Sequence, residues 1–463
     1  MKWKSIKDSL EGRLSGNCVS VVGRLKNIRK HKKRLFVDLV DYLGQVQLVV
    51  EKSNNPKGYD SLCDAGKGTY ILVDGTLGND RKGNSEIKVN KLEIIAKSSL
   101  NIKSPWDFDG SNPIYGNGVF SFTEAYVSNP QRAAILKIKT DFVKALHNYF
   151  QNDGFVLVEP PILTDKTLYG KDNAIEAEVH GEKVFLSQCA TFELEPLALA
   201  FGKVYTISPA FRNEPSGSKR HLAEYTHTKA EALFANINDL KNLSGNSIYY
   251  AMKKVLKLNE RELNILGVDL HIEGLKPKNH EHISYNDAIA VTQKKGSTIE
   301  WGEGLKRRDE IIITEYFGNK YVWVNFPPFI SEGFPYKRLP EDKRLSMTCD
   351  LIAPHGAGEM VGVAEKITDP EELIQNLIEK GQKNNIKNYW NYIALRENGM
   401  PPHGGIGAAP ERILYGLLNL DHIRLTKPWP RYPDRRIVTS ENDGLNNYGS
   451  KKLQKLIEKY DLR

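Results

Sequence analysis

The segment AFRNEPSGSKRHLAEYTHTKAEALF, residues 210–234, decides how the rest of this chain is interpreted. An apolar run leads into it, a Pro-Ser-Gly turn stands in its first half, and a second alternating run follows. This order predicts two strands joined by a loop. The loop concentrates polar side chains, among them Arg212, Glu214, Arg220 and His221. Most loops of this kind are solvated hairpin tips, so its function depends on the segments around it.

Length and composition indicate a globular protein with two or three domains. The chain has 463 residues, of which 40% are hydrophobic and 26% charged, as is typical of soluble proteins. No apolar run approaches the roughly 20 residues that a membrane helix needs, and the first residues lack the apolar core of a secretion signal. We therefore expect a cytoplasmic protein without a membrane partner. The cysteines lack the paired spacing of zinc sites or disulfides; they are Cys18, Cys63, Cys189 and Cys349.

The positive charge of the chain is concentrated near its N-terminus. Residues 1–97 contain 19 Lys and Arg against 11 Asp and Glu, so they carry all of the net charge of +8. A basic domain beside a neutral body suggests a polyanionic partner, although basic surfaces also serve solubility alone.

Five short runs rich in Val, Ile and Leu predict five strands in this region, at 19–25, 35–40, 45–50, 70–73 and 86–95. Five strands in so few residues suit a closed barrel of the oligonucleotide-binding (OB) type, which we assign to residues 1–97. A basic run that begins at Arg29 falls in the first hairpin, where it would line a nucleic-acid face. Phe36 on the next strand either stacks on a base or belongs to the core.

Beyond the barrel, the pattern predicts a linker over 98–125, an α+β domain over 126–437 and a helical C-terminal extension over 438–463. Strand runs mixed with helices, without strict alternation, favour a mainly antiparallel sheet flanked by helices. The expected helices lie at 134–150, 236–258, 285–293, 371–380 and 390–398. The expected strands lie at 155–158, 184–186, 204–207, 232–235, 321–325, 347–352 and 358–363.

The segment PPHGGIGAAPERILYGLLNLDHIR near the end of this domain combines glycines with a helix start. We expect its glycines to form a flexible segment that allows close approach, and Pro410 to begin a helix. Arg412 would then lie in the first turn, where the helix dipole disfavours a cation by about 0.3–1 kcal/mol. A cation in this place is a candidate for holding an anion, or it pairs with the neighbouring Glu411.

Three separated pieces of the sequence share one chemical logic. Arg212 and Glu214 lie on the loop, Glu359 lies in DLIAPHGAGEMVG, and Arg412 follows the glycines. Two arginines that neutralise phosphates and a carboxylate that holds a divalent metal suit a bound nucleoside triphosphate. No GxxxxGK[ST] loop is present, which argues against a P-loop fold.

With these pieces in view, the chain resembles the class II aminoacyl-tRNA synthetases, in particular the aspartate/asparagine subgroup and within it the asparaginyl enzymes. The three motifs of the class are similar to GFVLVEPP, FRNEPSGSKRHLAEY and GIGAAPERILYGLLNLDHIR, in that order. The resemblance extends from about residue 18 to Arg436. It implies an OB-type anticodon-binding barrel and a catalytic domain with an antiparallel sheet.

The resemblance implies an ATP site made of Arg212, Glu214, Arg220, His221, Tyr225, Glu359 and Arg412. In this site Arg212 contacts the α-phosphate, Glu214 the adenine amine, and Tyr225 stacks on adenine. The other cations bind the outer phosphates, and Glu359 holds Mg²⁺ together with Glu365 or Asp350. The implied reaction forms an acyl-adenylate and needs no side-chain nucleophile, because positioning and charge stabilisation supply the rate.

In this subgroup the barrel reads the central uridine of the anticodon with a Phe and a Gln eleven residues later. Phe36 and Gln47 stand at this spacing, and Arg29 lies in the basic run beside them. The implied partner is therefore a tRNA anticodon stem-loop.

The amino-acid pocket implied by the resemblance contains Gln188, Glu193, Leu194, Glu195, Lys229, Glu231 and Lys366. Leu194 stands where the aspartate enzymes carry a lysine that neutralises the substrate carboxylate, and Glu195 matches the asparagine form of this segment. Without the lysine a buried aspartate side chain would lack its charge partner. The pocket therefore favours asparagine over aspartate.

Several positions of this pocket depart from the family pattern. Leu168 replaces the glutamate that helps to hold the substrate's α-ammonium, Lys229 replaces an acidic residue, and Lys366 replaces an arginine that contacts the substrate side chain. An added ammonium should repel an α-ammonium that is held in the usual way. Alternatively, Lys229 points away and another acid, such as Glu193 or Glu231, takes over.

Three hypotheses follow. The first is a homodimeric asparagine-type synthetase that uses ATP and Mg²⁺ to charge tRNA(Asn) or a close relative. The second is a paralogue that adenylates a different carboxylate, for an amide or ester outside translation. The third is a non-catalytic tRNA-binding or regulatory protein, which the complete set of ATP-site residues disfavours.

Overall fold

The computed structural model describes residues 5–10, 12–13, 15–41, 44–98, 129–170, 172–214, 218–431 and 459. The chain divides into two compact units, one within Met1–Pro130 and the other Gln131–Ile437. The expected linker and the expected C-terminal extension lie outside the described residues except for Ser98 and Lys459, so both stay predictions. No helix among the described residues is long and apolar enough to cross a membrane.

The first unit is a closed five-stranded barrel, as the sequence predicts. Its strands pair in the order β1-β2-β3-β5-β4, and their bounds are β1 Cys18–His31, β2 Arg34–Val40, β3 Gln45–Glu51, β4 Tyr70–Asn79 and β5 Ser85–Ala96. Two helices accompany them, α1 Ile6–Leu10 and α2 Pro56–Cys63. Alternate residues of each strand point inward because side chains of a strand alternate between its faces. The inward set, such as Leu35, Val37 and Leu39, forms one apolar core.

The second unit is built on an eight-stranded sheet in the order β12-β13-β14-β15-β16-β11-β10-β6. The bounds are β6 Val156–Leu157, β10 Lys203–Phe211, β11 Glu224–Leu233, β12 Glu281–Ser284, β13 Val322–Asn325, β14 Thr348–Ala353, β15 Gly358–Glu365 and β16 His403–Ala408. The six central strands are antiparallel, and only the edge strands β12 and β6 pair in parallel. A small second sheet joins β7 Leu163–Thr164, β9 Glu182–Leu186 and β8 Ile175–Val179. This confirms the α+β fold with a mainly antiparallel sheet.

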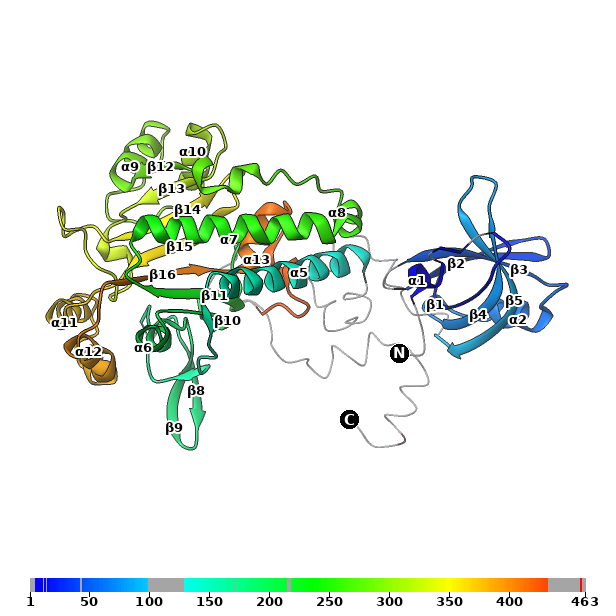
Figure 1. The fold of residues 1–463 in the computed structure, drawn as a ribbon, viewed down its shortest axis with the longest axis horizontal. Coiled ribbons are helices and arrows are strands. Elements are labelled where there is room, and N and C mark those ends of the chain that lie inside the picture. Colours follow the sequence, from blue (N-terminus) through cyan, green and yellow to red (C-terminus); the bar gives the residue numbers. More distant parts are fainter. Residues whose placement is uncertain are drawn as a thin grey trace. The chain divides into compact units, whose positions relative to one another are not determined.

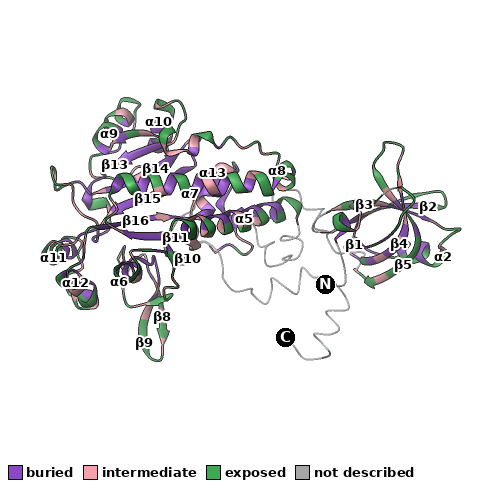
Figure 2. Cartoon of the chain, in the orientation of Figure 1, coloured by how far each residue is buried: buried purple, intermediate pink, exposed green. Residues whose placement is uncertain are grey.

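Two long helices, α5 Pro130–Asn152 and α7 Ile237–Leu258, run along one face of the sheet (Figure 1). Their apolar sides and the sheet residues beneath them form the largest core, while their outer sides are exposed (Figure 2). The remaining helices are α6 Thr191–Phe201, α8 Glu260–Leu266, α9 Tyr285–Lys294, α10 Arg307–Tyr316, α11 Pro370–Glu379, α12 Trp390–Glu397 and α13 Pro410–Leu417. Short 3-10 turns cover Glu273–Leu275, Pro277–Asn279, Phe329–Ser331, Lys383–Tyr389 and Ile423–Thr426.

The structure differs from the sequence predictions in several places. Gly404, Gly405 and Gly407 do not form a flexible segment but lie in β16, between β15 and β11 in the sheet. Backbone pairing with the strands on both sides holds these glycines extended. The intrinsic conformational freedom of glycine gives no sign of this in the sequence. Helices α1, α2, α6, α8 and α10 and strands β7, β8 and β12 were not predicted. Pro196 lies inside α6, and α10 contains three consecutive isoleucines, which have a low helix propensity.

Candidate functional site

One face of the sheet carries the polar residues of β11. Tyr225, His227, Lys229 and Glu231 alternate with residues such as Ala230 and Ala232, which belong to the core under α5 and α7. Because strand side chains alternate, the four polar residues share the opposite face. The sequence 225–231 thus places all four above the sheet.

The neighbouring strands supply a floor of small residues on this face. Gly405 and Gly407 of β16 pair with Glu231 and Lys229. A Cβ atom added at Gly405 would lie 2.2 Å from Oε2 of Glu231, and one at Gly407 would lie 3.1 Å from Nε2 of His227. The glycines therefore leave room that larger side chains would fill.

An open pocket with about 660 Å³ of empty space lies on this face. All seven residues that the sequence assigned to ATP line it together, from the end of β10, the loop that follows, β11, β15 and α13; they are Arg212, Glu214, Arg220, His221, Tyr225, Glu359 and Arg412. They come from segments as far apart as residues 212 and 412, so the fold brings the three predicted pieces into one site.

Arg212, which lines this pocket, contacts two aromatic rings. Its guanidinium carbon is 4.6 Å from the ring centre of Tyr169 and 5.8 Å from that of Tyr225. Nη1 of Arg212 lies 3.4 Å from Oε1 of Glu214. Cation–π contacts and the carboxylate restrict the guanidinium to one position. Tyr169 was not among the predicted site residues, although it lies in the LYG segment that departs from the family pattern.

Further cations line the same pocket. Burial, and then Arg412, lower the pKa of His221 to about 4. Burial also lowers the pKa of Arg412, although Glu359 opposes this. Glu411 is not the partner of Arg412, because its Oε1 accepts from Nζ of Lys139 at 2.6 Å and lies 3.2 Å from Nζ of Lys427. The pocket therefore carries positive charge that suits an anionic ligand.

The acidic candidates for a metal separate into two places. A Cβ placed on Gly362 would lie 3.3 Å from Oδ1 of Asp350 and 3.6 Å from Oε1 of Glu359, so these carboxylates are neighbours. Burial and Glu359 raise the pKa of Asp350 well above its usual value. Glu365 instead accepts from the backbone N–H of Ile237 at 3.1 Å. Asp350, and not Glu365, accompanies Glu359.

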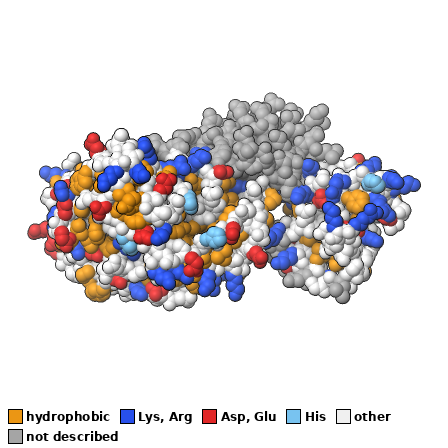
Figure 3. All heavy atoms as spheres, turned by 90° about the horizontal axis from the view of Figure 1, so that it is seen from above, with side chains coloured by type: hydrophobic (Ala, Val, Ile, Leu, Met, Phe, Trp, Pro, Cys, Tyr) orange, Lys and Arg blue, Asp and Glu red, His pale blue; other side chains and the backbone are white. Residues whose placement is uncertain are grey.

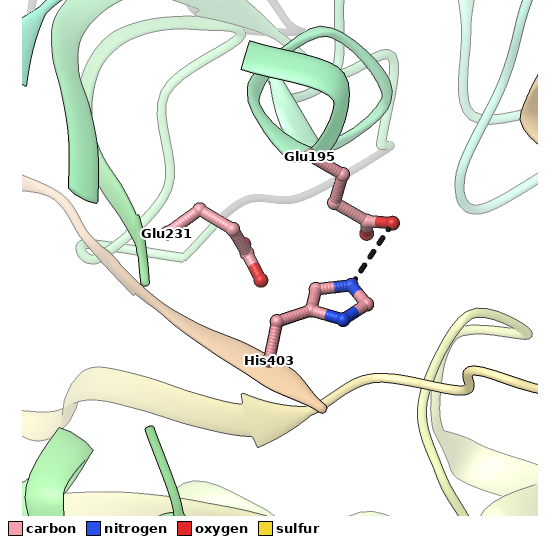
Figure 4. A group of neighbouring side chains, drawn as sticks. All are labelled: Glu195, Glu231 and His403. Atoms are coloured by element: carbon pink, nitrogen blue, oxygen red, sulfur yellow. Dashed lines mark ion pairs between the residues drawn. The ribbon is translucent and has the colours of Figure 1, made fainter. Parts of the chain in front are cut away.

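Beside the pocket, Glu195, Glu231 and His403 present ligand atoms within 4.8 Å of one another, all buried (Figure 4). Glu195 accepts from Tyr392 Oη at 2.6 Å, forms an ion pair with Arg396 and lies 3.3 Å from Nε2 of His403. Burial alone would raise its pKa, but Arg396, His403 and Lys366 hold the pKa below its usual value. Glu195 is thus a fixed carboxylate.

Glu231 and Lys366 of this cluster have buried polar atoms that lack hydrogen-bond partners among the described residues. Neither carboxylate oxygen of Glu231 has one, and neither does Nζ of Lys366, which lies 4.0 Å from Oε1 of Glu195. Burial raises the pKa of Glu231 and lowers that of Lys366. A buried polar group without a hydrogen bond raises the free energy of the folded protein. Glu231 can accept a hydrogen bond and Lys366 can donate one, so a ligand with both a donor and an acceptor would satisfy the two groups.

The other predicted pocket residues take different places. Nζ of Lys229 is buried and donates to Oγ1 of Thr191 at 2.7 Å. Oε1 of Gln188 accepts from the backbone N–H groups of Leu168 and Tyr169. Burial raises the pKa of Glu193 to about 7.

Leu194 does not face the polar cluster. It is completely buried in a small apolar core with Ala190, Ala198 and Val204. Sequence reasoning also missed Tyr392, Arg396 and His403. The spacing of Tyr392 and Arg396 on α12, one helical turn apart, places them on one face and could have indicated a joint role.

The predicted anticodon residues meet on the outer face of the barrel. One Nη2 atom of Arg29 donates to Oδ1 of Asp38 and to Oε1 of Gln47, both at 3.0 Å. Asp38 pairs with Gln47 across β2 and β3, and Phe36 is two residues from Asp38, half-buried on the same side. Lys and Arg side chains gather on the barrel in Figure 3.

Comparisons with known proteins agree with this geometry. Residues 122–433 match the family of tRNA synthetases class II (D, K and N), and residues 19–95 match the OB-fold nucleic acid binding domain. The chain is 30% identical over 426 residues to the asparagine–tRNA ligase of Thermococcus kodakarensis, covering 91% of this chain and 96% of that one. It is 32% identical over 418 residues to the enzyme of Desulforamulus reducens, covering 89% and 95%.

The fold also matches a solved structure closely. Asparaginyl-tRNA synthetase from Pyrococcus horikoshii, complexed with asparaginyl-adenylate, superposes with a TM-score of 0.86 at 28% identity, covering 94% of this chain and 99% of that one.

Proposed function

Because the chain belongs to the family of class II tRNA synthetases (D, K and N), we propose that it activates asparagine with ATP and transfers it to the 3′ end of tRNA(Asn). It is thus an AMP-forming ligase of protein biosynthesis. The observation that carries the amino-acid assignment is the unpaired donor and acceptor, Lys366 and Glu231, in the buried cluster.

A side-chain amide has two N–H donors and one carbonyl acceptor. Glu231 accepts from the amide nitrogen and Lys366 donates to its carbonyl oxygen, so asparagine satisfies both groups at once. The carboxylate of aspartate would face Glu231 and the fixed carboxylate of Glu195, which disfavours it.

The ATP pocket performs the activation without a side-chain nucleophile. A carboxylate oxygen of asparagine attacks the α-phosphorus, the bond to the β-phosphate oxygen breaks, and pyrophosphate leaves. Arg212 stabilises the charge that develops on the α-phosphate, while Arg220, His221 and Arg412 bind the outer phosphates. Glu359 and Asp350 would hold Mg²⁺, which would supply positive charge to offset that of the phosphates.

Transfer requires the matching tRNA, and we assign its anticodon to the barrel face of Phe36, Gln47 and Arg29. Phe36 stacks on a base, and Gln47 and Arg29 offer hydrogen bonds to base edges. This accounts for the positive charge of residues 1–97.

The active form is a homodimer. Large apolar side chains are exposed on or beside β6, β7 and α6, at one edge of the sheet, and a second copy would cover them; they are Val156, Leu157, Ile162, Leu163, Leu199 and Phe201. All four cysteines are free, which fits the reducing cytoplasm as the compartment.

The two rival hypotheses have less support. The curated relatives described above are asparagine–tRNA ligases, which does not favour a paralogue for another acid. The seven assembled ATP-site residues disfavour a non-catalytic protein.

The test is ATP–pyrophosphate exchange with each standard amino acid, followed by charging of tRNA(Asn) transcripts. We expect exchange with asparagine, weaker exchange with aspartate, and stable aminoacylation. The proposal would be refuted if none of the standard amino acids supported ATP–pyrophosphate exchange.

A further inference from the structure

Glu310 of α10 forms an ion pair with Arg220, one of the cations of the ATP pocket. Oε2 of Glu310 contacts Nη1 of Arg220, and the two side chains are only 9% and 12% exposed. Glu310 does not itself line the pocket, whereas Arg220 does. A charge-assisted bond at this depth restricts both groups more than a surface pair would.

The backbone of β15 is shaped around this pair. Gly358 has a φ of +83°, and a Cβ placed there would lie 1.9 Å from Nη1 of Arg220 and 3.1 Å from Oε2 of Glu310. The guanidinium therefore passes directly over the α-carbon of Gly358. A side chain at position 358 would displace the guanidinium. Two features therefore fix the position of Arg220: the missing side chain of Gly358 and the ion pair with Glu310.

The pair leaves part of Arg220 available. Its Nε is buried and has no hydrogen-bond partner among the residues that the structure describes, whereas Nη1 contacts Glu310. Arg220 also lowers the pKa of the nearby Arg412, while Glu310 raises it. Glu310 thus offsets the repulsion between two guanidinium groups that must stand side by side before any phosphate arrives.

We propose that Glu310 is a positioning residue for ATP, which holds Arg220 over Gly358 with Nε free and so assembles the phosphate-binding cations in advance. The proposal rests on the proposed function only in taking ATP as the ligand of the pocket. Preorganisation of this kind lowers the cost of ordering side chains on binding.

The test measures the affinity for ATP with Mg²⁺ by calorimetry in the absence of any amino acid. Glu310→Ala should weaken binding roughly tenfold, and Glu310→Gln should weaken it less because its amide oxygen still accepts from Nη1. In an Arg220→Ala background, Glu310→Ala should have no further effect, since coupled residues are not additive. Glu315→Ala, an exposed carboxylate on the same helix, is the matched control.

Additive effects of Glu310→Ala and Arg220→Ala would overturn the proposal, as would an unchanged affinity in both Glu310 variants. Thermal unfolding checks that the variants fold, and if Glu310→Ala does not, the Gln variant and its double mutant with Arg220→Ala carry the test. In pyrophosphate exchange the KM for ATP should rise while the KM for asparagine stays constant. Failure of the unmodified protein to bind ATP would refute the proposed function, whereas additivity refutes this inference alone.

Discussion

The ammonium of Lys229 donates a hydrogen bond to the hydroxyl of Thr191 at 2.7 Å, and both side chains are buried. From the sequence, an ammonium at position 229 is expected to repel the α-ammonium of the substrate. The hydrogen bond gives this ammonium a fixed place and an acceptor within the protein. Lys366 and Glu231, whose Nζ and carboxylate oxygens have no hydrogen-bond partner among the described residues, are the groups left for the substrate.

Thr191→Val should lower the free energy of unfolding by about 1–3 kcal/mol, because it removes the acceptor of a buried ammonium without changing the volume much. Urea denaturation measures the change. Thr191→Ser keeps the hydroxyl and should lose much less. Equal losses in both variants would mean that the methyl group, and not the hydrogen bond, matters.

Lys366→Met should raise the KM for asparagine at least about tenfold, since the donor to the amide carbonyl is lost. The KM for ATP should not change, because Lys366 does not line the ATP pocket. Pyrophosphate-exchange kinetics report both constants. Lys337→Met, which changes a more exposed lysine beside Glu365, is the control. A variant that raises both constants equally would speak against a specific role in the amino-acid site.

Arg412→Ala should reduce the rate of pyrophosphate exchange by about 10²–10³-fold, the usual effect of removing a donor to developing charge. Arg412→Lys keeps the charge but not the planar fork and should recover only part of the rate. Circular dichroism verifies the fold. Near-normal exchange in the Ala variant would remove Arg412 from the ATP site.

ATP affinity should depend on pH through His221. Burial and Arg412 lower the pKa of His221 to about 4, so its imidazole is neutral at pH 7. Phosphates bound beside it favour the protonated form and raise this pKa, so the complex takes up protons. Affinity should therefore increase as the pH falls through the raised pKa of the complex towards about 4.

Calorimetry at about pH 6 in two buffers of different ionisation enthalpy measures this proton uptake. Subtracting the result for His221→Asn removes the titration of ATP itself. Identical uptake by the two proteins would show that His221 does not bind the phosphates.

Phe36→Ala should lower kcat/KM for tRNA charging by a factor that corresponds to about 1–3 kcal/mol, the value of one stacked base. Exchange without tRNA should be unchanged, because the barrel is a separate compact unit. Tyr70→Ala, an exposed aromatic on β4, provides the comparison. Loss of exchange in Phe36→Ala would indicate damage beyond tRNA recognition.

Local patterns predicted most of the architecture. The alternation in β1 to β5 and the amphipathic pattern of α5 and α7 are encoded in consecutive residues. All of these elements are present, although β1 and β4 each extend six residues beyond their expected ends. The glycines of β16 misled the prediction, because their extended conformation depends on pairing with β11 and β15 and not on their own preference.

The ATP site was equally accessible from the sequence, because its residues lie in short motifs with distinctive composition. All seven line one pocket. The cluster around Glu195 and Glu231 was harder to predict from the sequence. Leu194 and Glu195 are neighbours in the sequence, yet their places on α6 send one into an apolar core and the other into the polar cluster.

The sequence by itself therefore determined the two-part organisation, the long helices and most strands of the main sheet, and a set of residues that line one pocket. Only the tertiary structure decided how buried charges are paired: Glu195 with Arg396, Arg220 with Glu310, Glu411 with Lys139, and Lys229 with Thr191. The physical reason is that such pairing depends on distances of a few ångströms between residues far apart in the chain, where low dielectric makes each partner decisive.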